Sequence, residues 1–100
     1  MEDSKAKFYL KLISNSIHEF STQKIALSKL VSDLETTIES LHEGSYKDAT
    51  VLWDSWCILE MIYASELSIK AKDPSYSCLT DLDVAGTLFS EIEKIRQLCL

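Results

Sequence analysis

With 100 residues, 46% of them hydrophobic and 9% aromatic, the chain is long enough for one domain with a single core. Its two glycines and one proline are too few for the closely spaced turns of a β-sandwich or barrel. A formal net charge of −6 disfavours binding to nucleic acid or to an anionic membrane surface, and it suits a cationic protein partner.

The spacing of the apolar residues predicts an all-α fold. Helices are expected at roughly residues 4–19, 22–42, 46–72 and 81–99, with short joints between them. Short joints favour antiparallel neighbours, so residues 1–100 are expected to form a single antiparallel four-helix bundle.

The first two predicted helices each carry an apolar stripe. In the first helix a second, smaller apolar patch of Phe8 and Leu12 lies on another side. Ser21 or Thr22 is expected to cap the second helix, and Gly44 to end it in a left-handed conformation. The residues of the two stripes are Ala6, Leu10, Ile13 and Ile17, and then Leu27, Val31, Leu34, Ile38 and Leu41.

The third predicted helix has two apolar faces at about 100° per residue. A helix that is apolar on two faces is buried on two sides, so it is expected to be the central helix of the bundle. Thr80 is then expected to cap the fourth helix. The first face holds Ala49, Trp53, Trp56, Tyr63 and Leu67, and the second holds Val51, Ile58, Ile62 and Ile69.

Glu60 falls near the middle of the tryptophan face of the third helix. A carboxylate taken out of water costs several kcal/mol unless it is paired or hydrogen-bonded. We therefore expect a partner for it: an indole N–H, a tyrosine hydroxyl, a backbone cap or a lysine. Trp53, Trp56, Glu60 and Tyr63 are interpreted as a structural core staple, with a recognition groove lined by Glu60 as the alternative.

No catalytic or metal motif stands out, so we expect no enzymatic activity, no catalytic residue, no metal site and no cofactor. Glu39 and His42 form one ExxH, but a di-iron bundle needs a second ExxH and two further inward carboxylates. Cys57, Cys78 and Cys99 are odd in number, widely spaced and without a CxxC pair, which indicates free structural thiols. A small metal-dependent enzyme remains a third alternative.

The opening residues, MEDSKAKFYLKLIS, lack the apolar run of a signal peptide, and no window reaches the roughly 18 apolar residues of a membrane span. A cytoplasmic location without membrane association is therefore expected.

An acidic stripe is the most informative surface feature. Glu35, Glu39 and Glu43 recur every four residues, and like charges at this spacing cost an isolated helix a few tenths of a kcal/mol each, roughly. The stripe is either a solvated face or an anionic patch that anchors a basic partner. The predicted partner-binding residues are Glu35, Glu39, Glu43, Tyr46, Asp48 and Asp54.

Three stretches, LSKLVSDLETTIESL, WDSWCILEMIYASEL and LTDLD before a last amphipathic helix, together resemble small helical immunity proteins of bacterial contact-dependent growth inhibition and related polymorphic-toxin systems. The resemblance implies a cytosolic antidote that binds the toxin domain of a sibling-cell effector and occludes its active site. Such toxins are often basic nucleases, and a ribonuclease is expected here. The resemblance supplies no catalytic residue.

The expected function is therefore that of an immunity protein, a monomer that forms a 1:1 complex with its cognate basic toxin domain without direct contact to nucleic acid. The alternative is a helical protein-interaction module, such as a secretion chaperone or a dimerising regulator. An exposed apolar stripe on the first or fourth helix, together with a homodimer in solution, would favour this alternative.

Overall fold

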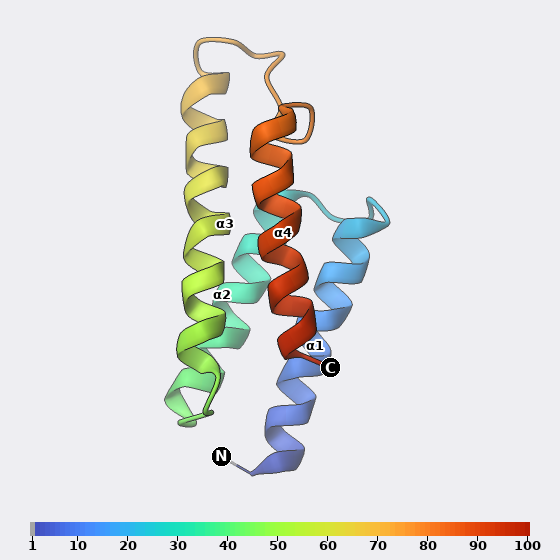
Figure 1. The fold of residues 1–100 in the computed structure, drawn as a ribbon, viewed down its shortest axis with the longest axis vertical. Helices are drawn as coiled ribbons and strands as arrows, with labels where there is room; N and C mark the ends of the chain where they lie inside the picture. Colours follow the sequence, from blue (N-terminus) through green and yellow to red (C-terminus); the bar gives the residue numbers. More distant parts are fainter. Residues whose placement is uncertain (1) are drawn as a thin grey trace.

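The computed structural model describes residues 2–100 and shows four helices that run alternately up and down (Figure 1). The helices are α1 (Asp3–Ser21), α2 (Leu27–Glu43), α3 (Ala49–Lys70) and α4 (Leu82–Leu98). No strand occurs in residues 2–100. The predicted all-α antiparallel bundle is confirmed.

The apolar stripe of α2 forms the middle of the core. Leu34, Ile38 and Leu41 have no exposed surface at all, because α2 packs against α1 on one side and α3 on the other. Ile13 on α1 and Leu88 and Ile95 on α4 are equally inaccessible. The stripes predicted from the sequence for α1 and α2 therefore face inward, apart from the half-exposed Leu10 at the margin of the core.

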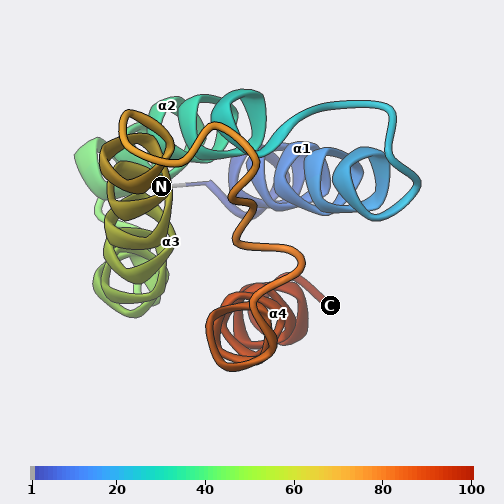
Figure 2. The ribbon, with the colours of Figure 1, turned by 90° about the horizontal axis from the view of Figure 1, so that it is seen from above.

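The interpretation of α3 as the central helix needs a correction. α3 packs against α2 and α4, as its two apolar faces predicted, but α2 also has two extensive neighbours, α1 and α3. Seen from the end in Figure 2, α3 occupies a corner of the bundle, and the interface between α1 and α4 is the smallest of the four.

The side of α3 that faces the core lies between its two predicted apolar faces, along a narrow polar edge that separates them on the helical wheel. Leu52 and Leu59, which belong to neither predicted face, have no exposed surface, and Ser55 from the edge is buried. In contrast, Val51 is 50% and Leu67 is 51% exposed. The two predicted apolar faces thus lie on either side of the buried edge, and neighbouring helices cover only part of each face.

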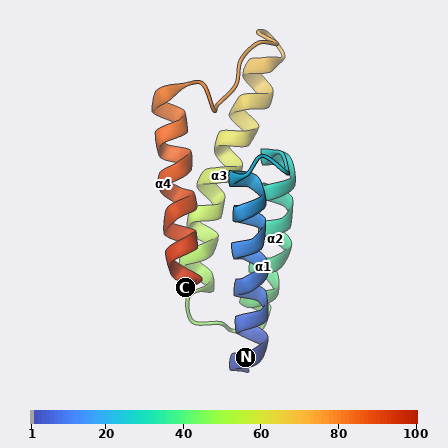
Figure 3. The ribbon, with the colours of Figure 1, turned by 90° about the vertical axis from the view of Figure 1, so that its right-hand side faces the viewer.

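The C-terminal half of α3 projects past the connection between α1 and α2, as Figure 3 shows most clearly. Met61, Leu67 and Ile69 are exposed in this half of the helix. The molecule is accordingly elongated, with principal extents of 46 × 23 × 19 Å.

The helix ends differ from the predicted caps. Thr22 ends α1, where its hydroxyl donates to the His18 carbonyl at 3.0 Å, and α2 begins only after Ala26 without a side-chain cap. Gly44 is not left-handed; the next residue, Ser45, has the positive φ of 60°.

At the fourth helix the cap is Asp81, whose carboxylate accepts the Val84 N–H, while the predicted cap Thr80 donates to the Ser77 carbonyl instead. The second and third helices therefore begin later than predicted, at Leu27 and Ala49, and α3 ends at Lys70.

Candidate functional site

Negative charge is concentrated in one part of the chain. Residues 30–69 contain eight acidic residues and a single lysine, Lys47, whereas the rest of the chain contains eight acidic and nine basic residues. Residues 30–69 comprise most of α2 and nearly all of α3, two helices that pack side by side (Figures 1 and 2). The protein thus carries its net charge on one pair of helices.

Most carboxylates of this segment have no cation of their own. The four ion pairs among residues 2–100 join Lys29 to Asp33, Lys70 to Glu66, Lys94 to Glu91 and Arg96 to Glu93. We call the five acids of α2 and α3 that take part in none of these ion pairs, together with the residue before α3, Asp48, the acidic face. Its members are Glu35, Glu39, Glu43, Asp48, Asp54 and Glu60.

A groove of about 330 Å³ opens beside Glu39, one residue of the acidic face. Glu39 and His42 line it from α2, and Thr50 and Trp53 line it from α3. Glu39, His42 and Thr50 are exposed and Trp53 is half-buried, so the groove is open to solvent. The structure therefore brings one predicted binding residue, Glu39, together with an aromatic ring.

Trp56 fixes the α2–α3 junction beneath this groove. Its indole N–H donates to the Val31 carbonyl of α2 at 2.8 Å, and its ring stacks on Trp53 with the centroids 4.7 Å apart. Trp56 is 8% exposed, whereas Trp53 reaches the surface. Of the predicted core staple, Trp56 is thus buried in the core and Trp53 links the core to the groove.

Tyr46 and Trp53 differ from their predicted roles. Tyr46 was expected at the surface as an anchor, but it is half-buried and packs against the core at the end of the bundle, near Asp3 and Ala6 of α1. Burial, followed by the nearby charge of Asp48, raises the pKa of Tyr46 above its usual value. The aromatic ring that faces the groove is that of Trp53.

The expectation for Glu60 is wrong. Glu60 is only half-buried, and within residues 2–100 its carboxylate has no hydrogen bond or ion pair. Of the two indoles among the expected partners, Trp53 and Trp56, that of Trp56 donates to the Val31 carbonyl instead. Tyr63 is half-buried against the core, so it fits the scaffold role, while Glu60 belongs to the acidic face.

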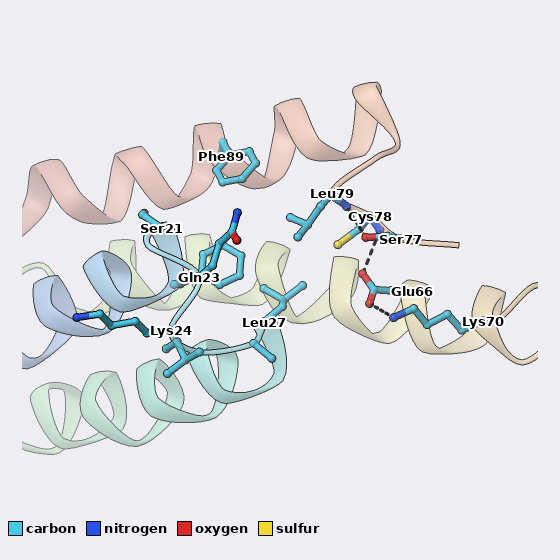
Figure 4. A pocket seen from close by; sticks show the side chains of 13 residues that line it. Ser21, Gln23, Lys24, Leu27, Glu66, Lys70, Ser77, Cys78, Leu79 and Phe89 are labelled. Carbon is cyan, nitrogen blue, oxygen red and sulfur yellow. Dashed lines mark hydrogen bonds and ion pairs between the residues drawn. The ribbon is translucent and has the colours of Figure 1, made fainter. Parts of the chain in front are cut away.

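A larger cleft, of about 540 Å³, lies between the α1–α2 connection and the upper parts of α3 and α4 (Figure 4). Phe20 and Phe89 approach each other across it with ring centroids 6.4 Å apart. Lys24, Lys70 and Glu66 are the charged groups in its lining.

Glu66 ties the α3–α4 connection to this cleft. Its carboxylate accepts the backbone N–H of Cys78 at 3.1 Å and pairs with Lys70 at 2.9 Å, as the dashed lines in Figure 4 show. Burial alone would raise the pKa of Glu66, but the hydrogen bonds from Cys78 and Lys70 and the charge of Lys70 outweigh it and lower the pKa. The i,i+4 spacing to Lys70 is visible in the sequence, but the bond across the connection is not.

The chemistry of the cleft is consequently structural. Burial and the neighbouring Glu66 raise the pKa of the Cys78 thiol to about 12, so at neutral pH it is not a thiolate. Burial likewise raises the pKa of Cys99 to about 11. The Glu66 carboxylate is already satisfied by two internal donors, the Cys78 N–H and the Lys70 amine.

Two further features are absent from residues 2–100. No group of three or more His, Cys, Asp or Glu side chains there could hold a metal ion, and Glu39 and His42 have no third ligand. None of the helices in this range is both long enough and apolar enough to cross a membrane.

Comparison with known proteins returned no matching family model, no similar curated protein and no similar solved structure.

Proposed function

We propose that this protein is an immunity protein, which binds a basic toxin domain with its acidic face and occludes the toxin's active site. The partner expected is a nuclease, in the first place a ribonuclease. A cleft that binds nucleic-acid phosphates is lined by cations, and the acidic face would occupy it in place of the phosphates. The inhibitor needs no catalytic residue for this function.

The observation that carries the proposal is that none of the six carboxylates of the acidic face forms an ion pair within residues 2–100. Carboxylates at (i, i+4) spacing repel each other, and Glu39 and Glu43 also lie near the C-terminus of α2, where negative charge is unfavourable. The chain contains ten basic residues but uses none of them to neutralise this face. An external cationic partner would provide the missing charge and would associate rapidly by electrostatic steering.

Co-expression tests the proposal. If the proposal is right, a gene directly upstream should encode a basic toxin domain that arrests growth when it is expressed alone, and this protein should restore growth. The variant with Glu35, Glu39, Glu43 and Asp48 all changed to lysine should fail to restore growth and should not co-purify with the toxin domain. Full rescue by a folded quadruple variant would show that another surface is used.

A second candidate is a helical interaction module that pairs with another copy or with a secreted protein. The observation that favours it is exposed apolar surface on the two outer helices: Phe8 is 58% and Leu12 is 38% exposed on α1, and Leu82 is 86% exposed on α4. Sedimentation equilibrium distinguishes the candidates, because a stable dimer that Phe8→Ser with Leu12→Ser dissociates would favour the module, and a monomer would favour the immunity protein.

A further inference from the structure

The groove between α2 and α3 combines three properties: concavity, an aromatic wall and an unpaired carboxylate. Glu39 supplies the carboxylate, Trp53 supplies the ring, and Thr50 and His42 complete the lining. No lysine or arginine lines the groove. The site is therefore anionic on one side and aromatic on the other.

We infer that this groove binds the guanidinium group of an arginine side chain from the basic partner. The inference rests on the proposed function and identifies the type of partner side chain that would anchor the complex. A guanidinium group is planar, carries five N–H donors and no acceptor, pairs with both oxygens of a carboxylate and stacks on an aromatic face. A lysine ammonium can use the charge of Glu39 but neither the planar ring contact nor the two parallel hydrogen bonds.

The lining residues match these requirements from both helices. The Glu39 carboxylate has no hydrogen bond or ion pair within residues 2–100, so both of its oxygens are available as acceptors. The Thr50 hydroxyl can accept a further N–H. Trp56 covers one face of Trp53 in the stack, and the remaining surface of that ring lines the groove.

The ring is also held in position before a ligand arrives. Trp56 donates to Val31 and stacks on Trp53, so the wall of the groove is anchored to the α2–α3 junction. Anchors of protein interfaces are commonly aromatic side chains that are already ordered in the free protein, because little conformational freedom is then lost on binding. The other acids of the acidic face line no such groove and contribute general attraction.

Hexa-arginine and hexalysine peptides of equal charge test the inference, with binding followed by tryptophan fluorescence and calorimetry at low salt. Hexa-arginine should bind at least about fivefold more tightly than hexalysine. Glu39→Gln should remove most of this preference. Its matched control, Glu43→Gln, removes the same charge one turn along α2 from a residue outside the groove and should weaken both peptides equally and slightly.

Trp53→Leu provides a second test, with circular dichroism as the check on folding, and it should also equalise the two peptides. If this variant does not fold, Glu39→Gln decides alone, because it alters an exposed side chain. Equal binding of the two peptides by the wild type would overturn the inference that the groove is an arginine site, and so would equal effects of Glu39→Gln and Glu43→Gln. Neither result would affect the proposal that the acidic face binds a basic partner. Binding of neither peptide would overturn both.

Discussion

Two carboxylates of α4, those of Glu91 and Glu93, are in the opposite situation to the carboxylates of the acidic face. On α4, Glu91 pairs with Lys94 at 2.8 Å, and Glu93 accepts from Arg96 and Gln97, each within one helical turn. On α2, Glu35, Glu39 and Glu43 follow one another at i,i+4 spacing, and none of the three forms an ion pair within residues 2–100. Glutamate side chains therefore stabilise α4 through ion pairs and destabilise α2 through mutual repulsion.

This difference separates charge that serves the fold from charge that is available for binding. The hydrogen bonds from Arg96 and Gln97 lower the pKa of Glu93 to about 2, so this carboxylate is committed to its own helix. The carboxylates of the acidic face form no comparable ion pairs with residues 2–100. Their repulsion is tolerated because the stability of α2 comes from buried residues such as Leu34 and Ile38 and not from its surface.

The largest effect is expected where the acidic face is joined to the core. Trp56→Ala should lower the free energy of unfolding by about 3–5 kcal/mol, because it removes a buried ring and the bond to Val31. Trp53→Ala should cost less, since Trp53 is half-exposed. Urea denaturation followed by circular dichroism measures both. Equal losses would mean that the two indoles share the structural role.

Glu66→Gln should lower stability by about 1–2 kcal/mol at neutral pH, because the ion pair with Lys70 is lost and the acceptor for Cys78 is weakened. The pKa of Glu66 is lowered in the folded protein, so its contribution is present above the ordinary value of 4.5 and is lost as the pH falls through the lowered pKa. Urea midpoints of the two proteins should therefore converge below pH 4.5. A constant gap at all pH values would contradict this role.

Removing the negative charges of Glu35, Glu39 and Glu43 on α2 should raise stability instead of lowering it. The triple variant Glu35→Gln, Glu39→Gln and Glu43→Gln should be more stable than the wild type by about 0.5–1 kcal/mol at low salt, because two repulsive pairs and their clash with the helix dipole disappear. The gain should fade in 0.5 M salt as screening shortens to about 4 Å. Thermal melts at both salt concentrations measure it, and a loss of stability would show hidden internal partners.

The smallest effect is expected on α4. Glu93→Gln should lower the melting temperature slightly, because an exposed pair with Arg96 contributes little. The direction of this change in melting temperature is informative, because it is opposite to the change expected for the triple α2 variant. An increase in melting temperature would remove the distinction between the two groups of carboxylates.

The fold was largely predictable because α1, α2 and α4 have apolar residues on defined stripes. For α3 the apolar residues surround most of the helix, so the wheel gives no unique inward direction. Leu52 and Leu59 were therefore missed as core residues, and Glu60 was placed inside when it is half-exposed. Only the position of α3 at a corner, with α2 and α4 as neighbours, decides its orientation.

The candidate site was predictable in its charge but not in its shape. Glu35, Glu39 and Glu43 are exposed, as their positions off the apolar stripe of α2 imply. The groove depends on which α3 residue stands opposite Glu39, and helix register across an interface is not encoded in local spacing. Trp53 was accordingly assigned to the scaffold, although it also lines the groove.

The most direct test of the account is nuclear magnetic resonance of the isotopically labelled protein titrated with hexa-arginine. Amide shifts should concentrate in residues 35–43 and 48–57, with the indole signal of Trp53 among the largest changes and residues 91–97 of α4 nearly unmoved. Shifts of equal size on α4, or shifts centred on the cleft beside Glu66, would contradict the claim that the α2–α3 carboxylates form the binding surface.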